Sequence, residues 1–124
     1  MKIRIKGNSL RLRLSQSEVK DMIDLGLVED SINFGSSQLT YRLIKNNTER
    51  TSVSFENNVI ELSVKSTVIS KWLVEQEVGF HEDIQLFDDQ HLSVLVEKDF
   101  QCLTVRKGED ESDLFQNPAQ AHGH

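Results

Sequence analysis

Five cations alternate with aliphatic residues at the start of the chain. Because successive side chains of a β-strand point to opposite faces, the cations of two paired strands would gather on one face. A sixth cation lies on the polar side of a later alternating segment. Lys and Arg bind carboxylates and phosphates through charge-assisted hydrogen bonds, which indicates a site for an acidic ligand or partner. The candidate ligand-binding residues are Lys2, Arg4, Lys6, Arg11, Arg13 and Arg42.

Two other groups of reactive residues carry weaker signals. The segment HEDIQLFDDQH has residue types that bind metals, but a hairpin turn at Asp88 and Asp89 would separate His81 from the partner of His91 by about 16 Å. A polar turn is therefore favoured over a metal site. Cys102 has no neighbouring histidine and no second cysteine, so neither a catalytic thiol nor an internal disulfide is indicated.

Composition limits the class of protein. The chain has 124 residues, 37% of them hydrophobic, and no apolar stretch of membrane-spanning length, so we expect a single cytoplasmic domain. The net charge of −6 is divided unevenly, because residues 1–50 sum to +3 and residues 51–124 to −9. The basic half is too weakly charged and too poor in stacking aromatics to favour a nucleic-acid partner.

The cations must be positioned by secondary structure, and the local sequence pattern predicts two hairpins and a helix. KIRIK and LRLRL alternate with period two on either side of Gly7, Asn8 and Ser9, which predicts a β-hairpin. SQSE follows as a capping box for a short helix that ends near Gly26. INF and QLTYRL, on either side of a Gly-Ser-Ser turn, predict a second hairpin.

The same order of elements recurs fifty residues later. A shift of 50 places Val53, Phe55 and Ile60 on Ile3, Ile5 and Leu10, and with three inserted residues the agreement extends through the helix and the second hairpin. The sequence therefore predicts two tandem ββαββ units, residues 1–50 and 51–100, which bury one core together.

Eight short strands and two short helices define an α+β fold, which we expect to form a strongly curved antiparallel sheet or an eight-stranded barrel. A flatter open sheet covered by a dimer partner is the alternative. Residues 1–107 would form the domain, and residues 108–124, which are acidic and poor in apolar residues, would form a mobile tail with Leu114 and Phe115 as a short anchor.

The paired-repeat layout is similar to the CYTH superfamily of triphosphate tunnel enzymes, although KIRIK stands where that superfamily has its ExExK motif. The resemblance implies a metal-dependent phosphohydrolase in which Lys and Arg hold phosphates and glutamates hold Mg²⁺. The glutamates that would bind the metal are Glu56, Glu61 and Glu97.

A second resemblance covers more of the chain. The opening MKIRIKGNSLRLRLS and the segment LVEKDFQCL resemble small bacterial proteins that form a family of unknown function, over most of residues 1–107. This resemblance implies a stand-alone protein and supplies no activity or catalytic residues.

Two functional hypotheses follow. The favoured one is a non-enzymatic binding module without a cofactor, whose basic hairpin meets an acidic ligand, an acidic protein or the acidic half of a second copy in a homodimer. The alternative is the tunnel-type phosphohydrolase, or a tunnel protein of the same layout that binds polyphosphate or a nucleotide.

Overall fold

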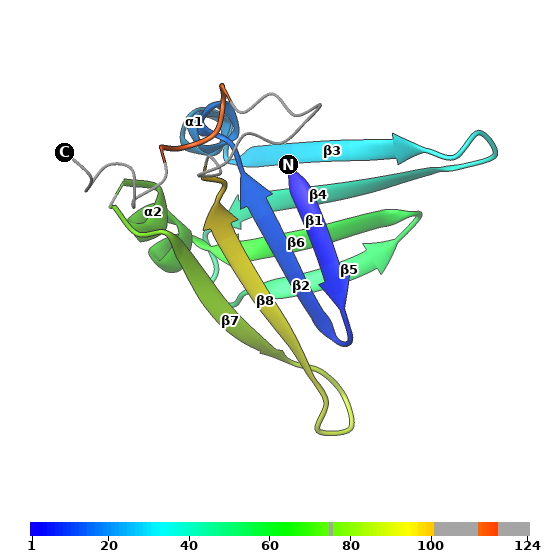
Figure 1. Cartoon of the computed structure of the whole chain (residues 1–124). Coiled ribbons are helices and arrows are strands. Elements are labelled where there is room, and N and C mark those ends of the chain that lie inside the picture. The colour runs from blue at the N-terminus through cyan, green and yellow to red at the C-terminus, as the bar shows by residue number, and fades with distance from the viewer. Residues whose placement is uncertain (75, 101–111, 117–124) are drawn as a thin grey trace.

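Two helices and eight strands form the described part of the computed structural model, which covers residues 1–74, 76–100 and 112–116 (Figure 1). The predicted α+β class with two short helices is confirmed. The elements are β1 Lys2–Lys6, β2 Ser9–Leu14, α1 Gln16–Leu25, β3 Leu27–Asn33, β4 Gln38–Asn46, β5 Ser52–Glu56, β6 Val59–Lys65, α2 Ser66–Val74, β7 Gly79–Gln85 and β8 His91–Lys98.

The strands form two four-stranded sheets. Sheet A has the order β1-β2-β8-β7 and sheet B the order β3-β4-β6-β5. In each sheet two antiparallel hairpins meet through a parallel central pair, β2 with β8 and β4 with β6. The expectation of one antiparallel sheet or a closed barrel is therefore corrected: the sheets are two, they are mixed, and among the described residues no ladder joins them.

The helices explain why the strands separate in this way. Each helix carries the chain from one sheet to the other, α1 from β2 to β3 and α2 from β6 to β7. Consequently the two hairpins on either side of a helix lie in different sheets, and each pairs with a hairpin from the other half of the chain. Alternation and turn residues predict hairpins, but they do not predict which hairpins share a sheet.

The core lies between the sheets and under the helices. Alternate residues of the central strands, such as Leu12, Leu43, Leu62 and Val96, are almost fully buried, as the period of two requires. Trp72 of α2 is also fully buried; its ring packs edge-on against Phe80 at 5.5 Å, and its Nε1 donates a hydrogen bond to the Val78 carbonyl. Its predicted role in core packing is confirmed.

Local signals set the ends of α1 as predicted. Ser15 and Glu18 form the capping box, and Gly26 adopts a left-handed conformation (φ 71°) while its N–H donates to the Met22 carbonyl at 3.0 Å. Asp88 and Asp89 form the β7–β8 turn with positive φ values, which confirms the predicted turn. No helix in the described residues has the length and apolar character needed to cross a membrane.

Residues 112–116 lie against the start of α1 and the end of β8. The Gln16 backbone N–H donates to the Asp113 carbonyl at 2.9 Å, and the Phe115 N–H donates to the Asp99 carbonyl at 2.8 Å. The rings of Phe100 and Phe115 pack with centroids 5.9 Å apart. The predicted anchor at Phe115 is thus observed, whereas Cys102 lies outside the described residues.

Candidate functional site

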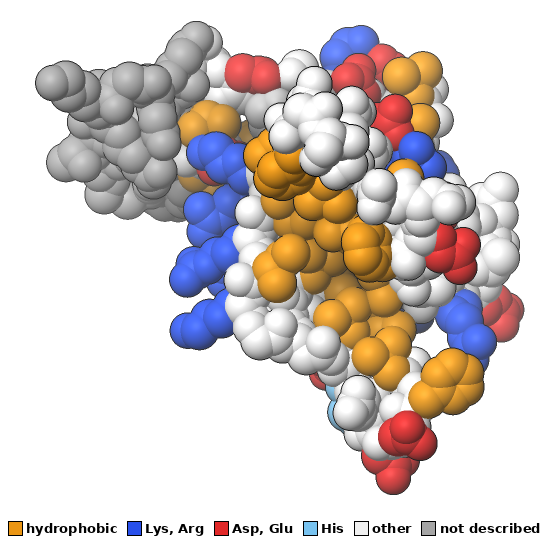
Figure 2. All heavy atoms as spheres, turned by 90° about the vertical axis from the view of Figure 1, so that its right-hand side faces the viewer, with side chains coloured by type: hydrophobic (Ala, Val, Ile, Leu, Met, Phe, Trp, Pro, Cys, Tyr) orange, Lys and Arg blue, Asp and Glu red, His pale blue; other side chains and the backbone are white. Residues whose placement is uncertain are grey.

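Five cations share the outer face of sheet A. Across the β1–β2 ladder Lys2 lies opposite Arg13, and Arg4 lies opposite Arg11, while the aliphatic residues between them point into the core. Figure 2 shows a column of Lys and Arg side chains along one edge of the molecule. A shallow hollow of about 200 Å³ lies among the side chains of this face. We call Lys2, Arg4, Lys6, Arg11 and Arg13 the basic face.

Two carboxylates of sheet A neutralise part of the basic face. Glu97 of β8 lies beside β2, and its Oε1 is 3.2 Å from Arg11 Nε and 3.5 Å from Arg13 Nε. This oxygen is buried and forms no hydrogen bond within the described residues, so its contacts with the two guanidinium groups are electrostatic. Asp99, which is only 5% exposed, forms an ion pair with Lys2, in which its Oδ2 lies 2.9 Å from Lys2 Nζ.

The cations of the basic face nearest the β1–β2 turn are not neutralised in this way by carboxylates of the described residues. In the described part of the chain, Arg4 and Lys6 form no ion pair with any carboxylate. Five cations therefore face two carboxylates, a local excess of +3 on a chain whose net charge is −6. The excess is concentrated toward the β1–β2 turn, away from the helices (Figure 1).

Arg42, the sixth predicted cation, lies on sheet B and not with the others. Its Nε is 2.8 Å from Glu29 Oε2, and its second nitrogen, NH1, is 3.2 Å from Glu61 Oε1. The three residues lie side by side on β3, β4 and β6. The hydrogen bonds to Glu29, and then to Glu61, raise the pKa of Arg42. The Arg42 guanidinium is therefore already paired with two carboxylates of its own sheet.

The three glutamates proposed for Mg²⁺ do not converge. Glu56 and Glu61 belong to sheet B and Glu97 to sheet A, where it contacts the arginines of β2. Among the described residues no group of three or more His, Cys, Asp or Glu side chains is arranged to hold a metal ion. The basic face also points outward, so its cations do not line an enclosed channel between the sheets.

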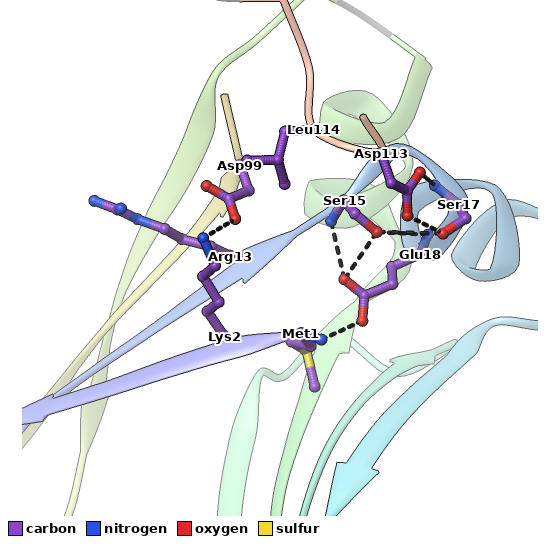
Figure 3. Close-up of a pocket in the computed structure, with 9 residues that line it drawn as sticks. All are labelled: Met1, Lys2, Arg13, Ser15, Ser17, Glu18, Asp99, Asp113 and Leu114. Carbon is purple, nitrogen blue, oxygen red and sulfur yellow. Dashed lines mark hydrogen bonds and ion pairs between the residues drawn. The ribbon is translucent and has the colours of Figure 1, made fainter. Parts of the chain in front are cut away.

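A polar junction at the start of the chain was missed by sequence reasoning (Figure 3). The Met1 amino group contacts Glu18 Oε2 and lies 3.2 Å from Asp30, while Glu18 Oε1 accepts from the Ser15 N–H at 2.9 Å. On the other side Asp113 accepts hydrogen bonds from the Ser17 N–H at 3.1 Å and the Ser17 hydroxyl at 2.5 Å. These groups satisfy one another, so the junction ties three segments together around a pocket of about 370 Å³.

Two carboxyl groups of this junction have lowered pKa values. Burial raises the pKa of Asp30, but the Ser31 N–H and the Met1 amino group stabilise its ionised form and lower the pKa overall. The hydrogen bonds from Ser17, and then from Ser15, lower the pKa of Asp113. Both groups are therefore ionised at neutral pH.

An apolar cleft between the two sheets is the second feature that sequence reasoning missed. It lies toward the hairpin turns, holds about 470 Å³, and is lined by Ile5, Leu10 and Leu92 of sheet A and Leu39, Phe55 and Ile60 of sheet B. Alternation places these residues on inward faces, but it does not show that the opposite sheet leaves them partly uncovered.

The comparisons with known proteins agree with the second sequence resemblance. No curated protein and no solved structure is significantly similar to the chain. A family model, however, matches residues 1–119, a range that includes the basic face and the residues 112–116 that contact α1. The chain belongs to DUF7009, a family of unknown function.

Proposed function

We propose that the protein is a non-enzymatic binding module whose basic face holds an acidic ligand or partner. The observation that carries this proposal is the direct opposition of Arg4 and Arg11 across the β1–β2 ladder. Like charges in this arrangement destabilise a sheet by a few tenths of a kcal/mol up to about 1 kcal/mol. An oxyanion bound between the two guanidinium groups would remove that cost.

Two features of the surrounding structure support ligand binding at this face. β2 is held between β1 and β8, so the cations of its outer face are carried by a paired strand whose core residues are buried. Arg4 and Lys6 form no ion pair within the described residues, so a ligand there would break none of the described ion pairs. Guanidinium groups pair with carboxylate and phosphate in the same bidentate geometry, so the ligand class is an oxyanion carried by a peptide or by a phosphate chain.

Binding of two anions tests the proposal and separates these sources. A glutamate-rich peptide and inorganic tripolyphosphate would be titrated into the protein by calorimetry at low and high salt. We expect at least one to bind with an affinity that falls as salt rises, and Arg4→Gln to weaken it several-fold. Lys20→Gln is the matched control, because it removes the same charge from a cation of α1 that pairs with Asp24.

The result that overturns the proposal is equally clear. If neither anion binds at millimolar concentration, or if Arg4→Gln and Lys20→Gln have equal effects, the basic face is an ordinary solvated surface. A preference for tripolyphosphate would identify phosphate as the ligand chemistry, and a preference for the peptide would identify an acidic protein surface.

We also infer that the chain arose by duplication of a ββαββ unit. The strand registers support this inference, because the pairing of Ile3 with Leu12 recurs fifty residues later as that of Val53 with Leu62. The parallel pairs correspond as well: Ser9 with Ser93 in sheet A matches Val59 with Thr40 in sheet B. Under this inference the basic face is the feature in which the two units differ most.

A further inference from the structure

Apolar side chains are exposed at the ends of all four hairpins. Ile5, Ile32, Phe34, Phe55 and Leu86 occupy inward positions of β1, β5 and the β3 and β7 hairpins, yet between 36% and 65% of each is exposed to solvent. Ile5 and Phe55 line the apolar cleft, and the other three residues lie at the ends of the remaining two hairpins. Figure 2 shows the result as an apolar stripe that runs down this face of the molecule.

The exposed area is that of a protein interface. Phe87, which is 91% exposed in the β7–β8 turn, extends the apolar surface formed by these five residues. The six side chains present roughly 700 Å² if a fully exposed side chain of this size counts as about 200 Å². An interface of standard size buries about 800 Å² on each partner. A small molecule that filled the cleft would leave Phe34 and Phe87 in water.

Charges of opposite sign follow the cleft residues Ile5 and Phe55 at the ends of their strands. Lys6 directly follows Ile5 at the end of β1, and Glu56 directly follows Phe55 at the end of β5. The two residues hold corresponding places in their ladders, opposite Ser9 and Val59. Neither forms an ion pair with another described residue.

We propose that a second copy of the chain covers the apolar cleft, in a two-fold dimer whose hairpin ends meet face to face. A two-fold axis that lies between the two copies, at right angles to the direction from Lys6 to Glu56, places each Lys6 against the Glu56 of the partner subunit, and each Glu56 against the partner's Lys6. The same operation closes apolar surface against apolar surface. Such a contact is isologous and forms a closed dimer.

Of the basic face this dimer uses only Lys6, at the end of β1, and it leaves the rest of that face in solvent. Arg4 and Arg11 stay accessible, so anion binding and dimer formation are separate properties with separate readouts. Failure of one proposal does not imply failure of the other.

Sedimentation equilibrium of the full chain tests the dimer. We expect the wild-type protein to be a dimer at about 10–100 µM and Phe55→Glu to be a monomer over that range, because the new carboxylate would be desolvated in an apolar interface. Leu25→Glu is the matched control: Leu25 is equally apolar and 73% exposed, but it lies at the end of α1, away from the hairpin turns. Far-ultraviolet circular dichroism would show that both variants stay folded.

Charge reversal tests the position of the axis. Lys6→Glu and Glu56→Lys would each weaken the dimer about two- to five-fold, the range for a partly exposed ion pair, and the double variant would restore it. A wild-type monomer at every concentration would overturn the proposal and assign the cleft to an apolar ligand. A Phe55→Glu dimer, or a double variant weaker than both single variants, would overturn it as well.

Discussion

Arg4 of β1 and Arg11 of β2 lie directly opposite each other on the outer face of sheet A. Arg11 shares Glu97 with Arg13, whereas Arg4 forms no ion pair with any described residue. The corresponding pair in sheet B is Ser54 and Glu61, which carries no such opposition of like charges. The basic face is thus a local departure from the pairing that would stabilise the hairpin best.

Replacement of Arg4 should increase stability while it removes anion binding. Arg4→Glu would place a carboxylate opposite Arg11, and we expect the free energy of unfolding to rise by about 0.5–1 kcal/mol. Urea denaturation measures the change. Ser54→Glu is the control of opposite sign, because it creates a like-charge pair with Glu61 and should lower stability by a similar amount. An Arg4→Glu protein less stable than wild type would contradict the account.

Trp72 should be the most sensitive position of the core. Its ring is fully buried beside Phe80, so Trp72→Ala would leave a large cavity and lower the free energy of unfolding by about 3–5 kcal/mol. Val74→Ala, at a residue of the same helix that is exposed, should change it by less than about 0.5 kcal/mol. Equal losses in thermal or chemical denaturation would show that α2 does not pack as described.

Glu18 joins the capping box to the start of the chain. Glu18→Gln would weaken its contacts with the Ser15 N–H and the Met1 amino group, and we expect a loss of about 1–2 kcal/mol in the free energy of unfolding. Asp21→Asn removes the same charge from an exposed position of α1 and serves as the control. Similar stabilities for the two variants would count against the junction.

Acid should loosen the contact between residues 112–116 and α1. The pKa of Asp113 is lowered in the folded state by hydrogen bonds from Ser17 and then from Ser15, so its contribution is present above the unfolded pKa and is lost as the pH falls through the folded pKa. Asp30 acts in the same direction, because the Ser31 N–H and the Met1 amino group outweigh the effect of burial on its pKa. The melting temperature should therefore fall in the acidic range.

The Asp113→Asn variant isolates the contribution of Asp113 to the pH dependence of the melting temperature. The variant should melt lower than wild type at neutral pH and lose less on acidification, since it no longer has the carboxylate that titrates. A wild-type protein and an Asp113→Asn variant with parallel profiles of melting temperature against pH would refute the assignment.

Much of the local structure followed from the sequence. The period of two in KIRIK and LRLRL, the capping box at Ser15 and the turn at Asp88 and Asp89 each depend on a few neighbouring residues, and all are present in the structure. The pairing of hairpins did not follow, because β2 beside β8 is a contact between residues some 84 positions apart, such as Ser9 and Ser93. Local pattern carries no information about that choice of partner.

The candidate site was also predicted only in part from the sequence. Alternation alone placed Lys2, Arg4 and Lys6 on one face, and the structure agrees. Alternation also placed Arg42 on a polar face, but this residue belongs to the other sheet, where it forms ion pairs with Glu29 and Glu61. The apolar cleft escaped prediction because inward residues such as Phe55 have the same pattern whether the opposite sheet covers them or not.

The most direct test of the central claim is a two-dimensional NMR titration with the anion that binds more tightly. We predict that the largest shifts map to the backbone of β1 and β2 around Arg4, Lys6 and Arg11, and that high salt suppresses them. Shifts centred on Arg42 in sheet B, or no shifts at millimolar anion, would contradict the account.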